Sequence, residues 1–128
     1  DKIILADLPG YGFSKFSKNL KDQLTQLINQ YFINRKNLKK IFLLIDCKLG
    51  IKSIDLDAMT IIGESGVSFS IILTKIDKCI KNYQIKNEKD ISNLLKNYPS
   101  SYSKIFSTSI IGNQGIVDVQ KDIYGLIQ

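Results

Sequence analysis

The 128-residue sequence contains no histidine and no tryptophan, and it has only two cysteines and two prolines. Without histidine, a Ser-His-Asp or Cys-His nucleophile is impossible, as is a zinc site with histidine ligands. Cys47 and Cys79 form no CxxC pair, so we interpret them as ordinary thiols. A disulfide between them is possible but is not expected in a reducing compartment.

Long hydrophobic runs are also missing. The longest apolar run is Ile41–Ile45, far short of the ~20 residues that span a bilayer. The first residues lack the apolar stretch of a signal peptide. At ~100–200 residues per domain, we expect one soluble cytoplasmic domain.

Negative charge is in the minority. The chain has 18 basic and 12 acidic residues, for a net charge of +6. A basic surface favours polyanionic partners such as RNA. The same lysines could equally be spread over solvated faces, and composition alone leaves both readings open.

What the chain does contain is an alternation of apolar runs and helical periodicities. The order β-α-β-α-β-α-β-α predicts a doubly wound, mostly parallel α/β sheet, in which ligands bind beyond the carboxyl ends of the strands. The expected strands are 2–6, 41–45, 69–73 and 105–107, and the expected helices are 17–35, 54–64, 87–97 and 116–126.

The first strand ends in the motif Asp7-Leu8-Pro9-Gly10. A carboxylate here can hold the water shell of a nucleotide-bound Mg²⁺, and a glycine three residues later lets a backbone N–H approach a terminal phosphate. A plain exit from a strand into a turn would use the same residues.

Two further motifs follow later strands. The Asp of Thr74-Lys75-Ile76-Asp77 can accept two hydrogen bonds from guanine, and adenine has no matching donor pair. After the last strand comes Phe106-Ser107-Thr108-Ser109, where backbone N–H groups could donate to guanine O6. Each motif alone is common, but their shared order and spacing at strand ends point to a guanine nucleotide.

Longer stretches support this interpretation. Residues 7–15, DLPGYGFSK, resemble the DLPGYGYAK of the EngB (YihA/YsxC) family of ribosome-biogenesis GTP-binding proteins. Residues 30–38 are similar to its EYLxxRxNL stretch, residues 46–55 to its DxRxGxxxxD segment, and residues 74–78 to its TKxDK. The resemblance covers nearly the whole chain and implies a P-loop GTPase type of sheet over residues 1–128.

On the base side, the resemblance implies that Asp77 and Lys75 read guanine, that Thr74 supports their loop, and that Ser107 and Thr108 contact O6. The base-side residues are then Thr74, Lys75, Ile76, Asp77, Phe106, Ser107 and Thr108.

On the phosphate side, it implies that Asp7 binds Mg²⁺ through water, with Leu8 and Pro9 beside it, and that the Gly10 N–H senses the γ-phosphate. Residues 10–18 would form a nucleotide-dependent switch. Tyr11 stands where many GTPases place the Gln that orients water, so the intact protein is expected to hydrolyse GTP slowly.

One essential part of such a protein is missing. None of the eight glycines precedes a lysine, so the chain has no GxxxxGK[ST] phosphate loop, and whether it is an enzyme by itself is open. We expect a carboxyl-terminal part of a G domain. In the family, the strand before the phosphate loop lies between the strands that end at Asp7 and Asp46. Without it, we expect either an unstable chain or direct pairing of those two strands.

The family also implies a monomer that binds the large ribosomal subunit or rRNA and acts in ribosome assembly and cell division (septation) in the bacterial cytoplasm. Two other readings remain. A receiver domain would use Asp46 as phosphoacceptor and Thr74 as switch, but it needs an acidic pair after its first strand. A nucleotide-free module could bind ribosomal RNA through a basic surface, formed by Arg35, Lys36, Lys39, Lys40, Lys48 and Lys52.

Overall fold

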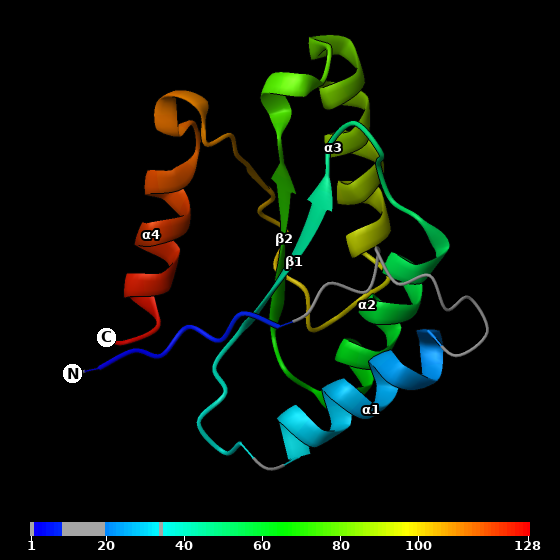
Figure 1. Ribbon diagram of the computed structural model, residues 1–128, viewed down its shortest axis with the longest axis vertical. Coiled ribbons are helices and arrows are strands. Elements are labelled where there is room, and N and C mark those ends of the chain that lie inside the picture. Colours follow the sequence, from blue (N-terminus) through cyan, green and yellow to red (C-terminus); the bar gives the residue numbers. More distant parts are fainter. Residues whose placement is uncertain (1, 9–19, 34) are drawn as a thin grey trace.

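The computed structural model describes residues 2–8, 20–33 and 35–128 (Figure 1). Its centre is a parallel sheet of three strands in the order β1-β2-β3, formed by Ile41–Asp46, Phe69–Thr74 and Phe106–Ser107. Ile41 pairs with Phe69 and Asp46 with Thr74, so β1 and β2 end level with each other. The predicted strands at 41–45, 69–73 and 105–107 are confirmed.

Helices cover both faces of this sheet. Figure 1 shows α4 (Ile116–Gly125) on one side, and α1 (Leu20–Ile33), α2 (Ser53–Ser65) and α3 (Lys81–Leu95) on the other. The predicted helices at 54–64 and 116–126 are confirmed, and α1 confirms the described part of the one predicted from residue 17. Among the described residues, no helix is both long and apolar enough to cross a membrane.

The middle strand carries the core. The first five residues of β2 are buried, and Phe69, Ile71 and Leu73 are fully so. Met59 and Ile62 of α2 and Ile91 of α3 pack into the same cluster. A strand that is apolar on both faces fits a sheet covered by helices on both sides. Its register with β1 places the loops after β1 and β2 at the same edge of the sheet.

α3 begins six residues earlier than predicted, because the polar stretch 81–86 is helical. Its composition indicated a loop, yet Gln84 and Asn87 are buried. Gln84 donates to Glu88 one turn later at 2.8 Å, and Asn87 donates to the carbonyl oxygen of Cys47 at 2.7 Å. A bond within α3 and one to the residue after β1 therefore satisfy these buried amides.

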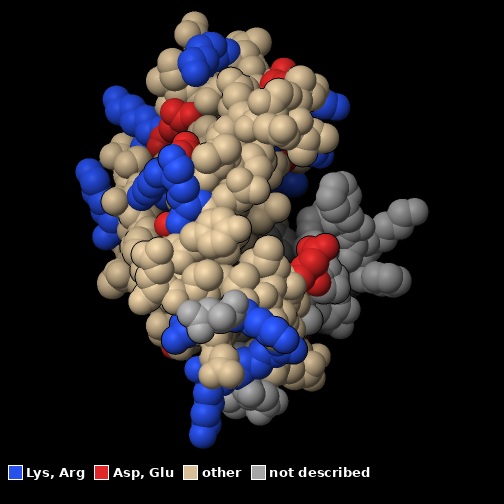
Figure 2. Space-filling model, turned by 90° about the vertical axis from the view of Figure 1, so that its left-hand side faces the viewer, with Lys and Arg blue, Asp and Glu red and all other residues tan. Residues whose placement is uncertain are grey.

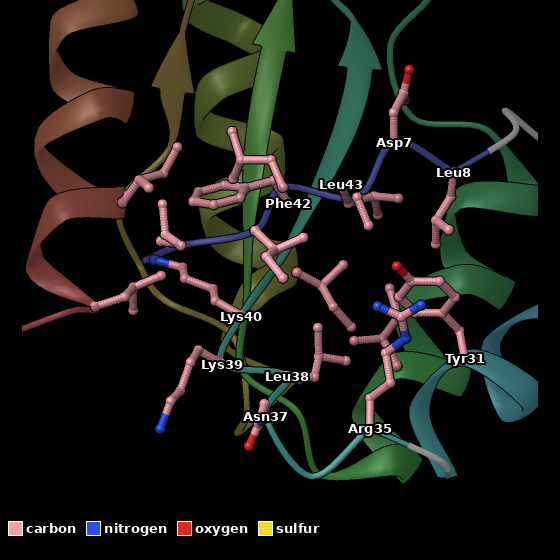
Figure 3. Close-up of a pocket in the computed structure, with 18 of the residues that line it drawn as sticks. Asp7, Leu8, Tyr31, Arg35, Asn37, Leu38, Lys39, Lys40, Phe42 and Leu43 are labelled. Atoms are coloured by element: carbon pink, nitrogen blue, oxygen red, sulfur yellow. The ribbon is translucent and has the colours of Figure 1, made fainter. Parts of the chain in front are cut away.

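The predicted strand at 2–6 is wrong. Residues 2–8 have no regular secondary structure, and in Figures 1 and 3 they run across the direction of β1 instead of alongside it. Ile4 and Leu5 are 83% and 70% exposed. Within the described part of the chain, β1 pairs only with β2. The expected direct pairing of the strands that end at Asp7 and Asp46 is therefore also wrong. A strand needs a partner for its backbone, and an apolar pattern does not provide one.

Candidate functional site

The loop after β2 has an unusual backbone. Lys75 lies in the left-handed region with φ of 56°, and Ile76–Lys78 form a short 3₁₀-helix. The amide of Ile76 donates to the carbonyl oxygen of Thr108 at 3.2 Å, while its side chain packs against the core. The loop after β2 is thus tied to the end of β3, and the Lys75 side chain, 57% exposed, is turned into solvent.

Asp77 receives a hydrogen bond from a residue 32 positions further along. The Ser109 hydroxyl donates to the exposed Asp77 carboxylate at 2.6 Å, and it accepts from the Ile111 amide at 3.1 Å. Ser109 itself is only 2% exposed. Because the Ser109 hydroxyl already orients this carboxylate, it loses less conformational entropy when it binds a planar pair of donors.

The residues predicted for the loop after β3 play different parts. Both the amide and the hydroxyl of Thr108 donate to the carbonyl oxygen of Leu73, at 2.8 and 3.0 Å. Phe106 is buried in the core, and the Ser107 hydroxyl donates to Glu88 at 2.7 Å. In this structure, therefore, Ser109 supplies the hydroxyl that contacts Asp77, whereas the hydroxyls of Ser107 and Thr108 bond to Glu88 and to Leu73.

Gly115 allows the loop after β3 to close. The Ser109 amide donates to the carbonyl oxygen of Gln114 at 3.0 Å. Gly115 follows with φ of 70°, and a Cβ atom there would lie 2.1 Å from the backbone oxygen of Ser107. No side chain fits in that space, so glycine is required.

Asp46 links the loops after β1 and β2. Its carboxylate accepts from the Lys48 amide at 2.9 Å and forms an ion pair with Lys75 Nζ at 3.5 Å. Sequence reasoning did not assign this residue to the base side. Parallel register explains the contact, because Asp46 is opposite Thr74, which places Lys75 just beyond it.

Cys47 follows Asp46, one member of this ion pair, in the sequence. It is fully buried, and its amide donates to the carbonyl oxygen of Thr74 at 3.0 Å. Burial, above all, together with a hydrogen bond to Cys79, raises the pKa of the Cys47 thiol to about 12. The thiol is therefore protonated at neutral pH.

The phosphate-side residues are arranged less tightly. Asp7 is exposed and Leu8 half-buried, and Figure 3 shows the Asp7 carboxylate pointing away from the cavity beside it. Pro9, Gly10 and the predicted switch 10–18 lie outside the described residues. In the parts of the chain that are described, no group of three or more acidic or cysteine side chains could hold a metal ion.

A cavity of about 910 Å³ lies between residues 2–8 and the outer edge of β1. Its lining is mostly apolar and includes Phe42 and Leu44 of β1. At one end of the cavity, the Arg35 guanidinium lies 4.0 Å from the Tyr31 ring centroid, as Figure 3 shows. The segment that carries Asp7 and β1 thus both line this cavity.

The predicted basic surface is divided. The Lys40 side chain is 2% exposed, forms an ion pair with Asp122 of α4, and has its amine 3.9 Å from the Tyr102 ring centroid. Arg35, Lys36 and Lys39 precede β1 and are exposed, whereas Lys48 and Lys52 follow it. The six-residue strand holds the two groups about 20 Å apart. On the face that Figure 2 shows, basic side chains likewise form separate groups.

No protein-family model matches the sequence. A solved structure does resemble the fold: apo translation elongation factor SelB from Methanococcus maripaludis, at a TM-score of 0.72 and 18% identity, covering 96% of this chain and 25% of that one. The three-stranded parallel sheet with its helices is thus a partial P-loop GTPase-type fold.

Curated relatives match over most of the chain. The proteins described as "Probable GTP-binding protein EngB" include one from Mycoplasmopsis synoviae, 38% identical over 92% of this chain and 60% of its own length. The relative from Caulobacter vibrioides is 32% identical over 98% of the chain and 55% of its own length. The chain thus spans a little over half of their length, and over most of its own length it is similar to these EngB proteins.

Proposed function

We propose that residues 1–128 are part of an EngB-type G domain, and that this part recognises the guanine base. The observation that carries the proposal is the Asp77 carboxylate, held by the buried Ser109 hydroxyl at 2.6 Å where the loops after β2 and β3 meet. The curated relatives are named GTP-binding proteins, which supports the same ligand.

Each base-side residue then has a role. Asp77 accepts from the N1–H and N2–H₂ groups of guanine, and the Lys75 stem lies over the base plane. Thr74 and Ile76 hold their loop against the sheet. Since Thr108 donates both its groups to Leu73, we assign contact with O6 to amides of the turn that follows Phe106, Ser107 and Thr108.

On the phosphate side, the exposed Asp7 carboxylate is chemically suited to Mg²⁺, which prefers oxygen ligands and keeps several waters. We propose that Asp7 holds the ion through water, beside Leu8, Pro9 and Gly10. Because the segment 2–8 lies across β1, this role requires it to move alongside the sheet. Bound Mg²⁺ would neutralise phosphate charge, and with Tyr11 after Gly10 we expect slow GTP hydrolysis by the intact protein.

The biological setting proposed for the intact protein follows from the family. It is assembly of the large ribosomal subunit, with a role in cell division and septation, in a monomer of the bacterial cytoplasm. The exposed Arg35, Lys36 and Lys39 are suited to contact with rRNA. The alternative is an RNA-binding module without nucleotide. Lys40 cannot belong to its basic surface, because the Lys40 amine is buried in an ion pair with Asp122.

The test is base selectivity, measured by equilibrium dialysis of this chain with GDP, XDP and ADP. We expect the wild-type chain to prefer GDP to ADP. Asp77→Asn should shift its preference from GDP towards XDP by at least about tenfold, because the amide donates where the carboxylate accepted. Asp90→Asn, an exposed carboxylate on α3, is the matched control. An unchanged GDP-to-XDP ratio in Asp77→Asn would remove Asp77 from the role assigned to it.

A further inference from the structure

The only two cysteines of the chain, Cys47 in the loop after β1 and Cys79 in the loop after β2, are in contact. The Cys79 thiol donates to the carbonyl oxygen of Cys47, with its sulfur 3.7 Å from that oxygen. The residue after β1 also contacts the end of β2, because the Cys47 amide donates to the carbonyl oxygen of Thr74. The Cys79 thiol thus already contacts the residue whose sulfur it would join in a disulfide.

The two thiols differ in exposure. Cys47 is fully buried, and Asn87 holds its carbonyl oxygen at 2.7 Å. Cys79 is only partly buried and ends the 3₁₀-helix of the loop after β2. An oxidant from solvent therefore meets Cys79 first, and Cys47 is the thiol waiting behind it.

We propose that Cys47 and Cys79 form an oxidative modification site, at which a peroxide converts the two thiols into one disulfide joining the loops after β1 and β2. In the first step, the Cys79 thiolate attacks hydrogen peroxide, which gives the Cys79 sulfenic acid and hydroxide. In the second, the Cys47 sulfur displaces the sulfenic oxygen, so an S–S bond forms and water leaves with the Cys47 proton. The two thiols lose two electrons and two protons, and peroxide is reduced to two waters.

The cross-link would act on the loops that carry the candidate base site. Asp46 immediately precedes Cys47, and Lys75 and Asp77 lie within four residues before Cys79. The disulfide would close a loop of about 30 residues, which removes entropy from the unfolded chain. This inference does not depend on guanine binding, since it concerns only the thiols and the loops that they join.

The experiment treats the purified 128-residue chain with stoichiometric hydrogen peroxide and follows it by intact mass, peptide mapping and thermal unfolding. We expect a mass loss of two hydrogen atoms, a cross-linked pair of peptides containing Cys47 and Cys79, and full reversal by dithiothreitol. The melting temperature should rise by roughly 5–15 °C on oxidation.

Two variants assign the steps. Cys47→Ala should stop at a sulfenic acid on Cys79, which dimedone labels, because the second thiol is gone. Cys79→Ser should keep Cys47 unmodified at the same peroxide dose, because Cys47 is buried. A wild-type chain that keeps both thiols, forms only disulfides between chains, or is labelled by dimedone as strongly as Cys47→Ala would overturn the proposal.

Discussion

The base side and the phosphate side of the candidate site are built on different supports. On the base side, the loops after β2 and β3 are joined by the bond from Ile76 to Thr108 and by the bond from Ser109 to Asp77. On the phosphate side, the segment carrying Asp7 forms no backbone hydrogen bond to β1 within the described residues, and the two line a cavity of about 910 Å³.

This difference has a physical cause. A loop that follows a paired strand inherits its position from the register of the sheet, and β1 and β2 end level with each other. A segment that is not paired with a strand is not positioned by this register, even when its sequence is apolar. The base side should therefore be sensitive to single substitutions and the phosphate side tolerant of them.

The largest effect is expected at Gly115. Gly115→Ala would place a Cβ atom 2.1 Å from the Ser107 backbone oxygen, so β3 or the loop after it must move. We expect a loss of at least about 3 kcal/mol in the free energy of unfolding, measured with urea. Gly112→Ala is the control: φ is 68° there, but nothing lies within 4 Å, so only the left-handed backbone cost of about 1 kcal/mol remains. Equal losses in both variants would contradict the packing argument.

The pH dependence of stability tests the buried support under the base side. The Cys47 thiol has a pKa of about 12 in the folded chain, against an ordinary value of 9.0. Above pH 9 the unfolded chain loses this proton while the folded chain keeps it, so stability falls as the pH rises from 9 to 12. At pH 10.5, the wild type should lose about 2 kcal/mol more than Cys47→Ala, relative to pH 8, in urea unfolding. Parallel pH profiles would show that the thiol ionises freely in the folded chain.

A smaller effect is expected from Ser109→Ala. Without the hydroxyl, Asp77 is no longer oriented and the Ile111 amide loses its acceptor. We expect the preference for GDP over ADP to drop about three- to tenfold in equilibrium dialysis. Ser107→Ala removes a comparable bond, to Glu88, away from Asp77, and should leave selectivity unchanged. If both variants lose selectivity alike, Ser109 acts only through the stability of the loop.

The sequence predicted most of the sheet because β1 is a continuous apolar run before its last residue, β2 is apolar except for Ser70 and its last residue, and the two strands pair with each other. The same reasoning failed for residues 2–6, where the pattern is equally apolar but no described strand pairs with them. It also failed at residues 81–86, a polar stretch that is helical and in which Gln84 is buried and bonded to Glu88. A local apolar pattern therefore shows that a segment can form a strand, and contacts with other elements decide whether it does.

The candidate site divides along the same line. Asp77 could be found from its motif, since one short string places it at the end of a strand. Its partner Ser109 is 32 residues further along. The motif does not distinguish Ser109 from the neighbouring Ser107 and Thr108, which also carry hydroxyls. Only the register of β2 with β3, which pairs Leu73 with Ser107, settles which hydroxyl lies beside Asp77.

The smallest effect is expected on the phosphate side, at Ile4. Its side chain is 83% exposed, so Ile4→Ser removes little buried apolar area and should change the free energy of unfolding by less than about 0.5 kcal/mol. Ile71→Ser, in a fully buried position of β2, should by contrast cost at least about 3 kcal/mol. A large loss in Ile4→Ser would mean that residues 2–8 pack against the sheet in solution, and the two sides of the site would then share one support.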